Sequence, residues 1–357
     1  MYNSTTMDKE KGAEVMGKTL ADIAKEIGVS TATISRVLNG EDNVSAHTRE
    51  KVLSALEKEN YQKRTRRSSV EFRNGETVLI IAGQLQNPIT LGFIDGIRSR
   101  LYEEGLRCMI SLSDYDSAVE CDILQYAAKN GFSGIFMLNA IENRNLIRHV
   151  TRMKTPIIFV NRYLRSVDMD VVTVDNYRCG YLATEYLIER GHRRIAHIAG
   201  PSSSVTCQNR TQGYFDAMRA HNLPIEDHYV FYGDRRYRCG RDFGEIICQM
   251  PANKSFSAVF STTGLMAAGM VDVLLREGIQ VPNDVSVICN DDYSRDYMPC
   301  PMDFTTFEQD PILMGKTAAS LLLDRIAFPE QAAKRMVFPP TLTEHNSVIS
   351  LHRADKK

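Results

Sequence analysis

Five polar side chains crowd into one short stretch near the start of the chain. The stretch GVSTATISRVLNG carries four hydroxyl residues and one arginine: Ser30, Thr31, Thr33, Ser35 and Arg36. Serine and threonine compete with a helix for its backbone hydrogen bonds, so they favour caps and turns over helix interiors. One or two of them are ordinary on a surface helix. Four hydroxyl groups beside a guanidinium indicate a partner that accepts hydrogen bonds.

A second set of polar residues stands directly after short apolar runs in the rest of the chain. Asn161, Thr263 and Asp291 follow runs that are typical of buried parallel strands. In such sheets ligands bind beyond the carboxyl ends of the strands. These residues are therefore candidate ligand contacts.

The common catalytic and metal-binding patterns are absent from the sequence. None of the eight cysteines forms a CxxC pair or stands near clustered histidines, as zinc sites require. No G-x-S-x-G, P-loop or strand-linked G-x-G-x-x-G occurs. We expect no metal, no cofactor and no enzymatic activity, with an enzyme that uses Asp291, Asp292 or His192 as the alternative.

The hydroxyl-rich stretch lies within a predicted unit of three helices. Thr19 and Asp22 form a capping box for the first helix, which ends at Gly28. Ser30 is the expected cap of the second helix, and Ser45 that of the third. The residues predicted to face inward from the second and third helices are Ile34, Val37, Leu38, Val52, Leu53 and Leu56. Two helices joined by a short turn and supported by a third form a helix-turn-helix unit.

From residue 76 the pattern changes to short apolar runs separated by amphipathic helices. One such helix carries Leu91, Ile94, Ile97 and Leu101. The apolar runs are residues 77–83, 134–140, 156–162, 170–176, 194–200, 257–263 and 285–291. Such runs predict parallel sheets covered by helices on both faces, and their total length predicts two α/β lobes.

Composition limits the classes of partner. The chain has 357 residues, 43% of them hydrophobic, and a net charge of −1. Binding to nucleic acid would therefore depend on a local surface. No secretion signal or long apolar run is visible, so we expect a cytoplasmic protein without a membrane partner.

The motifs resemble those of the LacI/GalR family of bacterial transcription regulators. The resemblance is dense in TLADIAKEIGVSTATISRVLNG and VSAHTREKVLSALEKENY, within residues 19–61. It continues in DNYRCGYLATEYLIERGHRRIAHIAGP and VPNDVSVICNDD, and covers about residues 18–350. It implies a small all-α helix-turn-helix headpiece followed by a two-lobed body of parallel sheets, like that of periplasmic binding proteins.

The resemblance implies that the second helix enters the DNA major groove and reads bases. On this chain the base-reading positions are Thr31, Ala32 and Arg36. Thr31 would bond a base edge and Ala32 would contact a thymine methyl group. Arg36 would bond a guanine edge through two N–H groups.

The other polar residues of the headpiece are implied to hold the DNA backbone or the helix cap. Ser30, Thr33 and Ser35 fill this role, with Thr19 and Asn39 completing the set. The alternative for Thr33 and Ser35 is a hydrogen bond back to their own helix.

Residues 62–75 depart from the family pattern. Relatives usually carry proline, asparagine and small residues here, in a hinge helix that inserts a leucine into the minor groove. Four of the five residues 63–67 of this chain are cations, with Val70 near the leucine position: Lys63, Arg64, Arg66 and Arg67. We expect phosphate contacts from the cations and a smaller wedge from Val70. A solvated charged tether is the alternative.

In the body, the resemblance implies an effector held by Arg210 and Asp291. A carboxylate bonds vicinal hydroxyls and an arginine supplies complementary donors. The alternative is a salt bridge between the two without a role in binding. Arg235 stands where relatives carry an aromatic residue, and favours an anionic effector unless it points to solvent. The remaining candidate contacts are Asn161, Thr263, Ile89 and Thr90.

The expected organisation is a disordered lead-in (1–17), the headpiece (18–61), a hinge (62–75) and an effector-binding and dimerisation domain (76–357). The chain is expected to cross between the lobes near residues 175, 300–310 and 337.

The expected function is that of a transcription regulator, a repressor, controlled by a carbohydrate-like effector between the lobes. A homodimer would bind a pseudo-palindromic double-stranded DNA operator. The alternatives are a phosphosugar, sugar acid or purine-like effector, an activator, an enzyme, or a free-standing sugar-binding protein.

Overall fold

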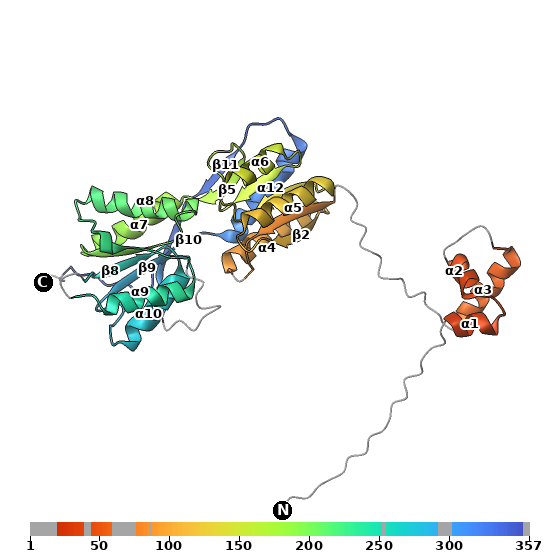
Figure 1. Ribbon diagram of the computed structural model, residues 1–357, viewed down its shortest axis with the longest axis horizontal. Helices are drawn as coiled ribbons and strands as arrows, with labels where there is room; N and C mark the ends of the chain where they lie inside the picture. The colour runs from red at the N-terminus through yellow and green to blue at the C-terminus, as the bar shows by residue number, and fades with distance from the viewer. Residues whose placement is uncertain are drawn as a thin grey trace, which may run out of the picture. The chain divides into compact units, whose positions relative to one another are not determined.

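The computed structural model describes residues 20–38, 44–58, 76–85, 87–251, 255–291 and 302–352. They belong to two compact units, one within residues 1–71 and one within residues 72–357 (Figure 1).

The first unit contains three helices around a small apolar core. They are α1 (Leu20–Glu26), α2 (Thr31–Leu38) and α3 (Ala46–Lys58). The buried side chains that form this core are those of Ile23, Ala24, Ile34, Val37, Val52 and Leu56. The three helices confirm the predicted helical unit.

Local capping fixes the ends of these helices. Gly28 has φ +66°, and the Val29 N–H donates to the Ala24 carbonyl, the bond of a Schellman cap. The Ser30 Oγ accepts from the Thr33 N–H at 3.1 Å, and the Ser45 Oγ accepts from the Thr48 N–H at 3.2 Å. The predicted caps at Ser30 and Ser45 are confirmed.

One prediction for the third helix is wrong. Leu53 is 49% exposed, whereas Val52 and Leu56 are buried. Val52 and Leu56 are one turn apart on the inner face of α3, and Leu53 is turned about 100° away from Val52. The side chain of Leu38 lies outside the described residues.

The second unit consists of two α/β lobes. Lobe 1 contains a six-stranded parallel sheet of order β11-β5-β4-β3-β1-β2. Its strands are β1 (Thr77–Ala82), β2 (Arg107–Leu112), β3 (Gly134–Met137), β4 (Ile157–Val160), β5 (Asp170–Val174) and β11 (Arg335–Phe338). Its helices are α4 (Pro88–Tyr102), α5 (Ser117–Lys129), α6 (Arg144–Arg152) and α12 (Pro311–Ala327).

Lobe 2 contains a sheet of order β12-β10-β9-β8-β6-β7, in which only β12 is antiparallel to its neighbour. Its strands are β6 (Ile195–Ala199), β7 (Val230–Tyr232), β8 (Ala258–Ser261), β9 (Ser286–Asn290), β10 (Thr305–Glu308) and β12 (Thr341–Thr343). Its helices are α7 (Asn176–Glu189), α8 (Val205–Ala220), α9 (Tyr237–Cys248), α10 (Gly264–Arg276) and the short 3₁₀ helix η1 (Asp227–Tyr229).

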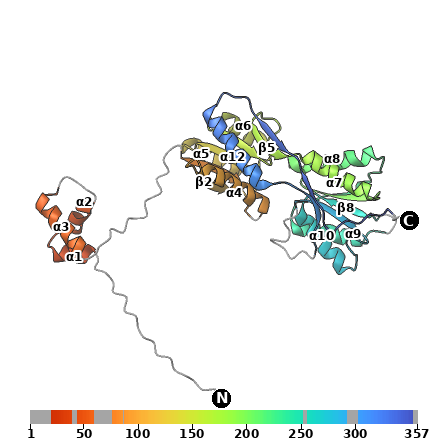
Figure 2. The same cartoon turned by 180° about the vertical axis from the view of Figure 1, so that it is seen from behind.

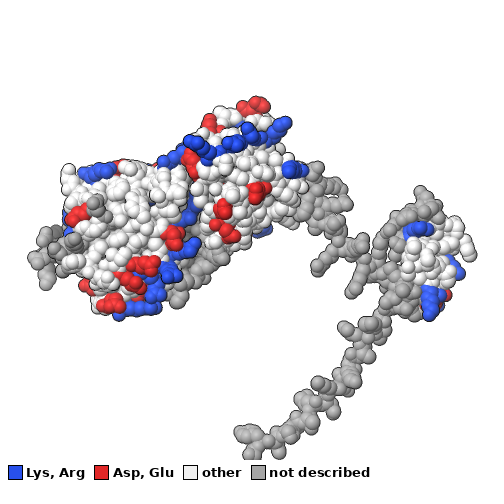
Figure 3. All heavy atoms as spheres, viewed as in Figure 1, with Lys and Arg blue, Asp and Glu red and all other residues white. Residues whose placement is uncertain are grey.

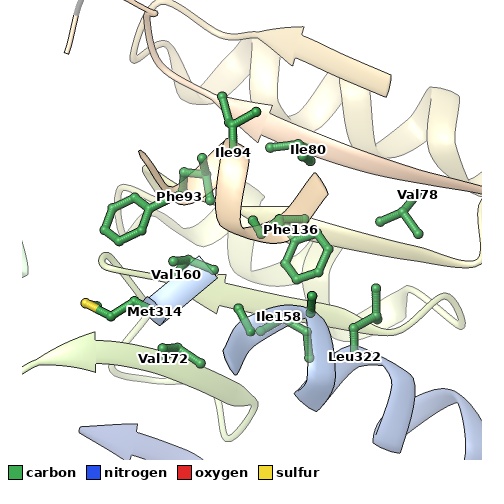
Figure 4. Packing of buried hydrophobic residues seen from close by; sticks show 14 of the residues in the cluster. Val78, Ile80, Phe93, Ile94, Phe136, Ile158, Val160, Val172, Met314 and Leu322 are labelled. Carbon is green, nitrogen blue, oxygen red and sulfur yellow. The ribbon is translucent and has the colours of Figure 1, made fainter. Parts of the chain in front are cut away.

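Helices cover both faces of each sheet, as continuous apolar strands require. In lobe 1, α4 and α12 pack on one face with Val78 and Ile80, while Leu79 and Ile81 pack on the other. Figure 4 shows the first of these cores, in which Phe93, Met314 and Leu322 lie beside strand residues such as Ile158 and Val160. In lobe 2, α7 and α8 lie on one face and α9 and α10 on the other (Figure 1).

Leu91 differs from its predicted inward position. Ile94, Ile97 and Leu101 of α4 are buried, but Leu91 is 40% exposed. Phe93 is buried on the inner face of α4, and Leu91, two residues earlier, is turned about 200° away from it.

The two lobes are connected by three passages of the chain (Figure 2). The chain leaves lobe 1 after β5 and enters lobe 2 at α7. It returns between β10 and α12, and passes to lobe 2 again between β11 and β12. Each lobe is therefore assembled from distant parts of the sequence.

The charged surface and the polarity of the described helices are consistent with the near-zero net charge and moderate hydrophobic content of the chain. Charges of both signs are spread over the face of the second unit that Figure 3 shows. In the part of the chain that is described, no helix is both long enough and apolar enough to cross a bilayer. The same residues contain no group of three or more His, Cys, Asp or Glu side chains that could hold a metal ion.

Candidate functional site

The outer face of α2 presents the predicted base-reading residues. Thr31, Ala32 and Arg36 are exposed, while Ile34 and Val37 are buried on the opposite face. Among the described residues Arg36 has no ion-pair or hydrogen-bond partner. Its guanidinium is therefore available to a ligand.

The hydroxyl groups at the start of α2 have local roles. The Ser30 Oγ and the Thr33 Oγ1 lie 2.9 Å apart, and the same Ser30 oxygen accepts the Thr33 N–H. The Thr33 hydroxyl thus bonds to the side chain of the capping residue instead of to a helix carbonyl. A hydroxyl oxygen has two lone pairs and one proton, so both groups retain hydrogen-bonding capacity.

Several predicted DNA contacts lie outside the described residues. They are Thr19, Asn39, Lys63, Arg64, Arg66, Arg67 and Val70, together with the side chain of Ser35. Their roles stay predictions.

In the second unit, unusual backbone conformations gather at the carboxyl ends of strands. Tyr115, Asn161, Arg235 and Asp291 have φ of 62°, 68°, 71° and 54°. They follow β2, β4, β7 and β9 in the chain. Non-glycine residues in this region each cost on the order of 1–3 kcal/mol, and they occur most often at functional sites. The strand ends of both lobes therefore contain the candidate binding site.

Arg210 and Asp291 form a buried ion pair at this edge of lobe 2. The Arg210 Nη2 donates to the Asp291 Oδ2 at 3.1 Å. The Gln309 Nε2 donates to the same oxygen at 3.0 Å. Burial raises the pKa of Asp291, and the Arg210 guanidinium opposes this effect. Burial alone would lower the pKa of Arg210, but the Asp291 carboxylate outweighs it and the pKa is raised.

The rest of the Arg210 guanidinium is held by lobe 2. Its Nε donates to the Asn176 Oδ1 at 2.9 Å, and its Nη1 donates to the Thr262 carbonyl at 2.8 Å. Gly180 makes the first of these bonds possible, because a Cβ at Gly180 would overlap the Arg210 carbonyl. The close approach of α7 and α8 thus fixes the position of the arginine.

The other predicted effector contacts are placed on both lobes. Asn161 lies at the end of β4, and Ile89 and Thr90 lie half-buried in the first turn of α4. Thr263 caps α10, with its Oγ1 accepting from the Met266 N–H at 3.4 Å. The hydroxyl oxygen of Thr263 thus already accepts a hydrogen bond from the backbone of α10.

Arg235 is half-buried and packs against the protein. Its guanidinium carbon lies 5.3 Å from the ring centroid of Tyr115, a residue of lobe 1. Its neighbour Arg236 instead pairs with Asp234 at 3.4 Å, on the surface. The contact between Arg235 and Tyr115 joins the strand ends of the two lobes.

Sequence reasoning missed two residues of this region, Tyr115 and Arg162. The guanidinium carbon of Arg162 lies 5.5 Å from the centroid of the same Tyr115 ring. Arg162 follows Asn161 directly, so its position after an apolar strand could have identified it. No sequence signal indicated Tyr115, because β2 is not a continuous apolar run.

A cavity of about 240 Å³ also lies between the lobes. The Arg165 Nη2 donates to the Asn209 Oδ1 at 2.7 Å and so joins the lobes beside it. The residues that line the cavity are Ala140, Glu142, Tyr163 and Arg165 of lobe 1 and Ser203, Val205 and Gln208 of lobe 2. Val205 and Gln208 belong to the first turns of α8, the helix that carries Arg210.

Two protein-family models match the chain. Residues 19–63 match the model described as bacterial regulatory proteins, lacI family. Residues 184–348 match the periplasmic binding protein-like domain.

Individual relatives agree with these matches. The HTH-type transcriptional regulator CelR of Thermobifida fusca is 32% identical over 339 residues, which cover 92% of this chain and 98% of CelR. A structure of a transcriptional regulator CelR–cellobiose complex is 29% identical, with a TM-score of 0.70, and covers 92% of this chain and 99% of that one. The lac repressor dimer bound to operator and the anti-inducer ONPF has the same fold, with 22% identity, a TM-score of 0.69 and coverage of 94% and 100%.

Proposed function

The chain belongs to the lacI family of bacterial regulatory proteins, and on that premise we propose that it is an effector-controlled repressor. Family membership makes it a DNA-binding transcription regulator and not an enzyme. In the proposal, a homodimer binds two operator half-sites and a carbohydrate-like molecule between the lobes changes the affinity for DNA.

The observation that carries the DNA-binding part is the arrangement of α2. Ile34 and Val37 fix the helix to the core, and Thr31, Ala32 and Arg36 face outward. An arginine in this position can bond the two acceptors of a guanine edge in the major groove. The hydroxyl groups at the start of α2 would bond phosphate oxygens and set the register.

The buried pair of Arg210 and Asp291 supports the effector part. Its charges lie at the carboxyl ends of the lobe 2 strands, where ligands of open α/β sheets bind. The cavity beside α8 has walls from both lobes, so a molecule bound there would respond to their relative position. A ligand that prefers one arrangement of the lobes shifts the population toward that arrangement. The relative solved with cellobiose supports a carbohydrate.

Exposed apolar side chains on lobe 1 support the homodimer. Leu91 of α4 and Ile312 and Leu313 of α12 are 40–48% exposed, and the two helices pack against each other. Apolar patches of this kind mark protein–protein interfaces. The lac repressor relative is a dimer on its operator.

The test uses the full-length protein and an operator selected from random duplex DNA. Arg36→Ala should weaken specific binding by about 1–3 kcal/mol and relax one base position, because a bidentate base contact is lost. Arg276→Ala, which removes an exposed arginine from α10 of lobe 2, is the matched control and should bind as the wild type does. An equal loss on every DNA sequence would limit Arg36 to phosphate contact. No loss at all would refute α2 as the reading helix.

A further inference from the structure

Arg162 is a buried cation without a counter-ion among the described residues. Its exposed fraction is 6%, and no hydrogen bond or ion pair joins its guanidinium to any residue that the structure describes. Burial lowers the pKa of Arg162. A buried charge is costly unless it is paired. An anionic ligand would supply the partner that Arg162 lacks among the described residues.

The carboxyl group that acts on this cation, that of Glu120, does not fully neutralise it. Glu120 is fully buried and bonded by Asn139, and burial raises its pKa to about 7, so it carries only part of a charge at neutral pH. Asp291 is already bonded by Arg210. Among the described residues, no carboxylate therefore forms an ion pair with the Arg162 guanidinium.

A second arginine approaches the same place from the other lobe. Arg235 of lobe 2 and Arg162 of lobe 1 both lie against the ring of Tyr115, at 5.3 Å and 5.5 Å. Arg235 also has no ion-pair partner among the described residues. Both Tyr115 and Arg235 have positive φ, so the backbone is strained at the point where the lobes meet.

We propose that Arg162 and Arg235 together bind one anionic group of the effector, a phosphate or a carboxylate, beside the Tyr115 ring. Guanidinium groups bond both anions through parallel N–H groups. Because the two arginines belong to different lobes, the anion would replace repulsion across the junction by attraction and favour one arrangement of the lobes. The proposal deepens the proposed function and depends on its effector site.

The structure also offers a competing role, in which the arginines only stack on the aromatic ring. Cation–π contacts occur within about 6 Å of a ring centroid, as both do here. This role requires no anion. The two roles predict opposite changes in the melting temperature when Arg162 is replaced by an apolar residue of similar length.

The test measures the melting temperature of the full-length protein in sodium phosphate, sodium acetate and sodium chloride at equal ionic strength. One of the first two anions should raise the melting temperature above that in chloride in a saturable way. A response to phosphate alone assigns a phosphate group, and one to acetate alone assigns a carboxylate. Arg162→Met and Arg235→Gln should each weaken the apparent affinity about tenfold or more, and Arg236→Gln should leave it unchanged.

A second readout separates binding from stacking. In chloride, Arg162→Met should raise the melting temperature, because it removes an uncompensated buried charge, whereas loss of a stacking contact would lower it. If Arg162→Met does not fold, Arg235→Gln decides the question by its anion response alone. The proposal is overturned if the wild type responds to neither anion, or if the response survives the substitutions. The operator experiment with Arg36→Ala depends on neither arginine, so its failure would instead overturn the proposed function.

Discussion

The ion pair between Arg210 and Asp291 should be strongly and unequally sensitive to the removal of either partner. The two side chains are 7% and 6% exposed, and the atoms that bond are 3.1 Å apart. Removing one partner of a buried pair costs about 3–5 kcal/mol, because the other charge stays buried. In Asp291→Leu, Arg210 keeps its bonds to Asn176 and to the Thr262 carbonyl, which satisfy hydrogen bonds but not the charge. We therefore expect a loss of about 3 kcal/mol, to which leucine adds about 1 kcal/mol because Asp291 has a positive φ.

The reverse substitution should cost less. In Arg210→Met, Asp291 can take up a proton, because burial already raises its pKa and Gln309 still bonds it. Arg210 cannot become neutral in this way, since an arginine does not lose its proton in proteins. Arg210→Met should thus cost about 1–2 kcal/mol less than Asp291→Leu. Its stability should also improve on acidification, because the folded state would then bind the proton more tightly than the unfolded state does.

The assay is equilibrium unfolding in urea, followed by circular dichroism, for both single variants and the double variant. The double variant should be more stable than the sum of the single losses predicts, by a coupling of about 2 kcal/mol or more. Asp95→Ala is the control, because it breaks the exposed pair with Arg98 at 2.8 Å and should cost under about 1 kcal/mol. Additive losses, or an Asp291→Leu loss no larger than the control, would refute the reasoning.

Two further predictions concern residues that support the site. The raised pKa of Glu120, about 7 against its ordinary 4.5, means that the folded state holds the carboxyl proton more tightly than the unfolded state does. The contribution of Glu120 to the free energy of unfolding is therefore full below pH 4.5 and falls by roughly 3 kcal/mol as the pH rises to 7. Glu120→Gln should remove this decline and be the more stable form at pH 8 in urea unfolding, and an unchanged pH dependence would contradict the assignment. Gly180→Val should lower stability by about 1–3 kcal/mol through overpacking, as measured by the same unfolding assay, because its side chain would overlap the Arg210 carbonyl. Arg178→Val, at an exposed position of the same α7, controls for the cost of valine in a helix and should lose under about 1 kcal/mol. A Gly180→Val loss no larger than that of the control would show that α7 and α8 can separate.

The interior strands were predictable from the sequence because they are buried on both faces. Each of the seven apolar runs contains a strand of the structure, from β1 to β9. The strands that the apolar pattern missed are mostly at sheet edges: β2 and β11 in lobe 1, and β7 and β12 in lobe 2. An edge strand is partly exposed and needs no continuous apolar run.

Strand β10 was missed for a different reason. It lies inside the lobe 2 sheet, yet it begins with Thr305 and Thr306, both fully buried. The Thr305 Oγ1 donates to the His345 carbonyl, and the Thr305 N–H donates to the Ser347 Oγ. These partners are about forty residues away in the chain, so no local pattern could show that the polar groups of Thr305 are satisfied in the core.

The residues of the candidate site also divide into those that the sequence could predict and those that it could not. The positions of Asn161 and Asp291 after apolar strands were visible in the sequence, and the structure places both at strand ends. The meeting of Arg162, Tyr115 and Arg235 was not visible, because it depends on how two lobes face each other. Residues more than forty positions apart lie against one ring. Only the folded chain brings these charges together.

The sequence left open whether Arg210 and Asp291 form a structural salt bridge or bind effector, and the geometry makes the two roles compatible. Arginine has five N–H groups, of which three bond Asn176, Thr262 and Asp291. Asp291 accepts the side-chain bonds of Arg210 and Gln309 through Oδ2, and the Gln309 backbone also bonds the carboxylate. A carboxylate has about four lone-pair sites, so the group can still accept from a hydroxyl group. An effector could therefore add bonds to the pair without breaking it. The pair would orient hydroxyl groups while Arg162 and Arg235, which lack such partners, would select for charge.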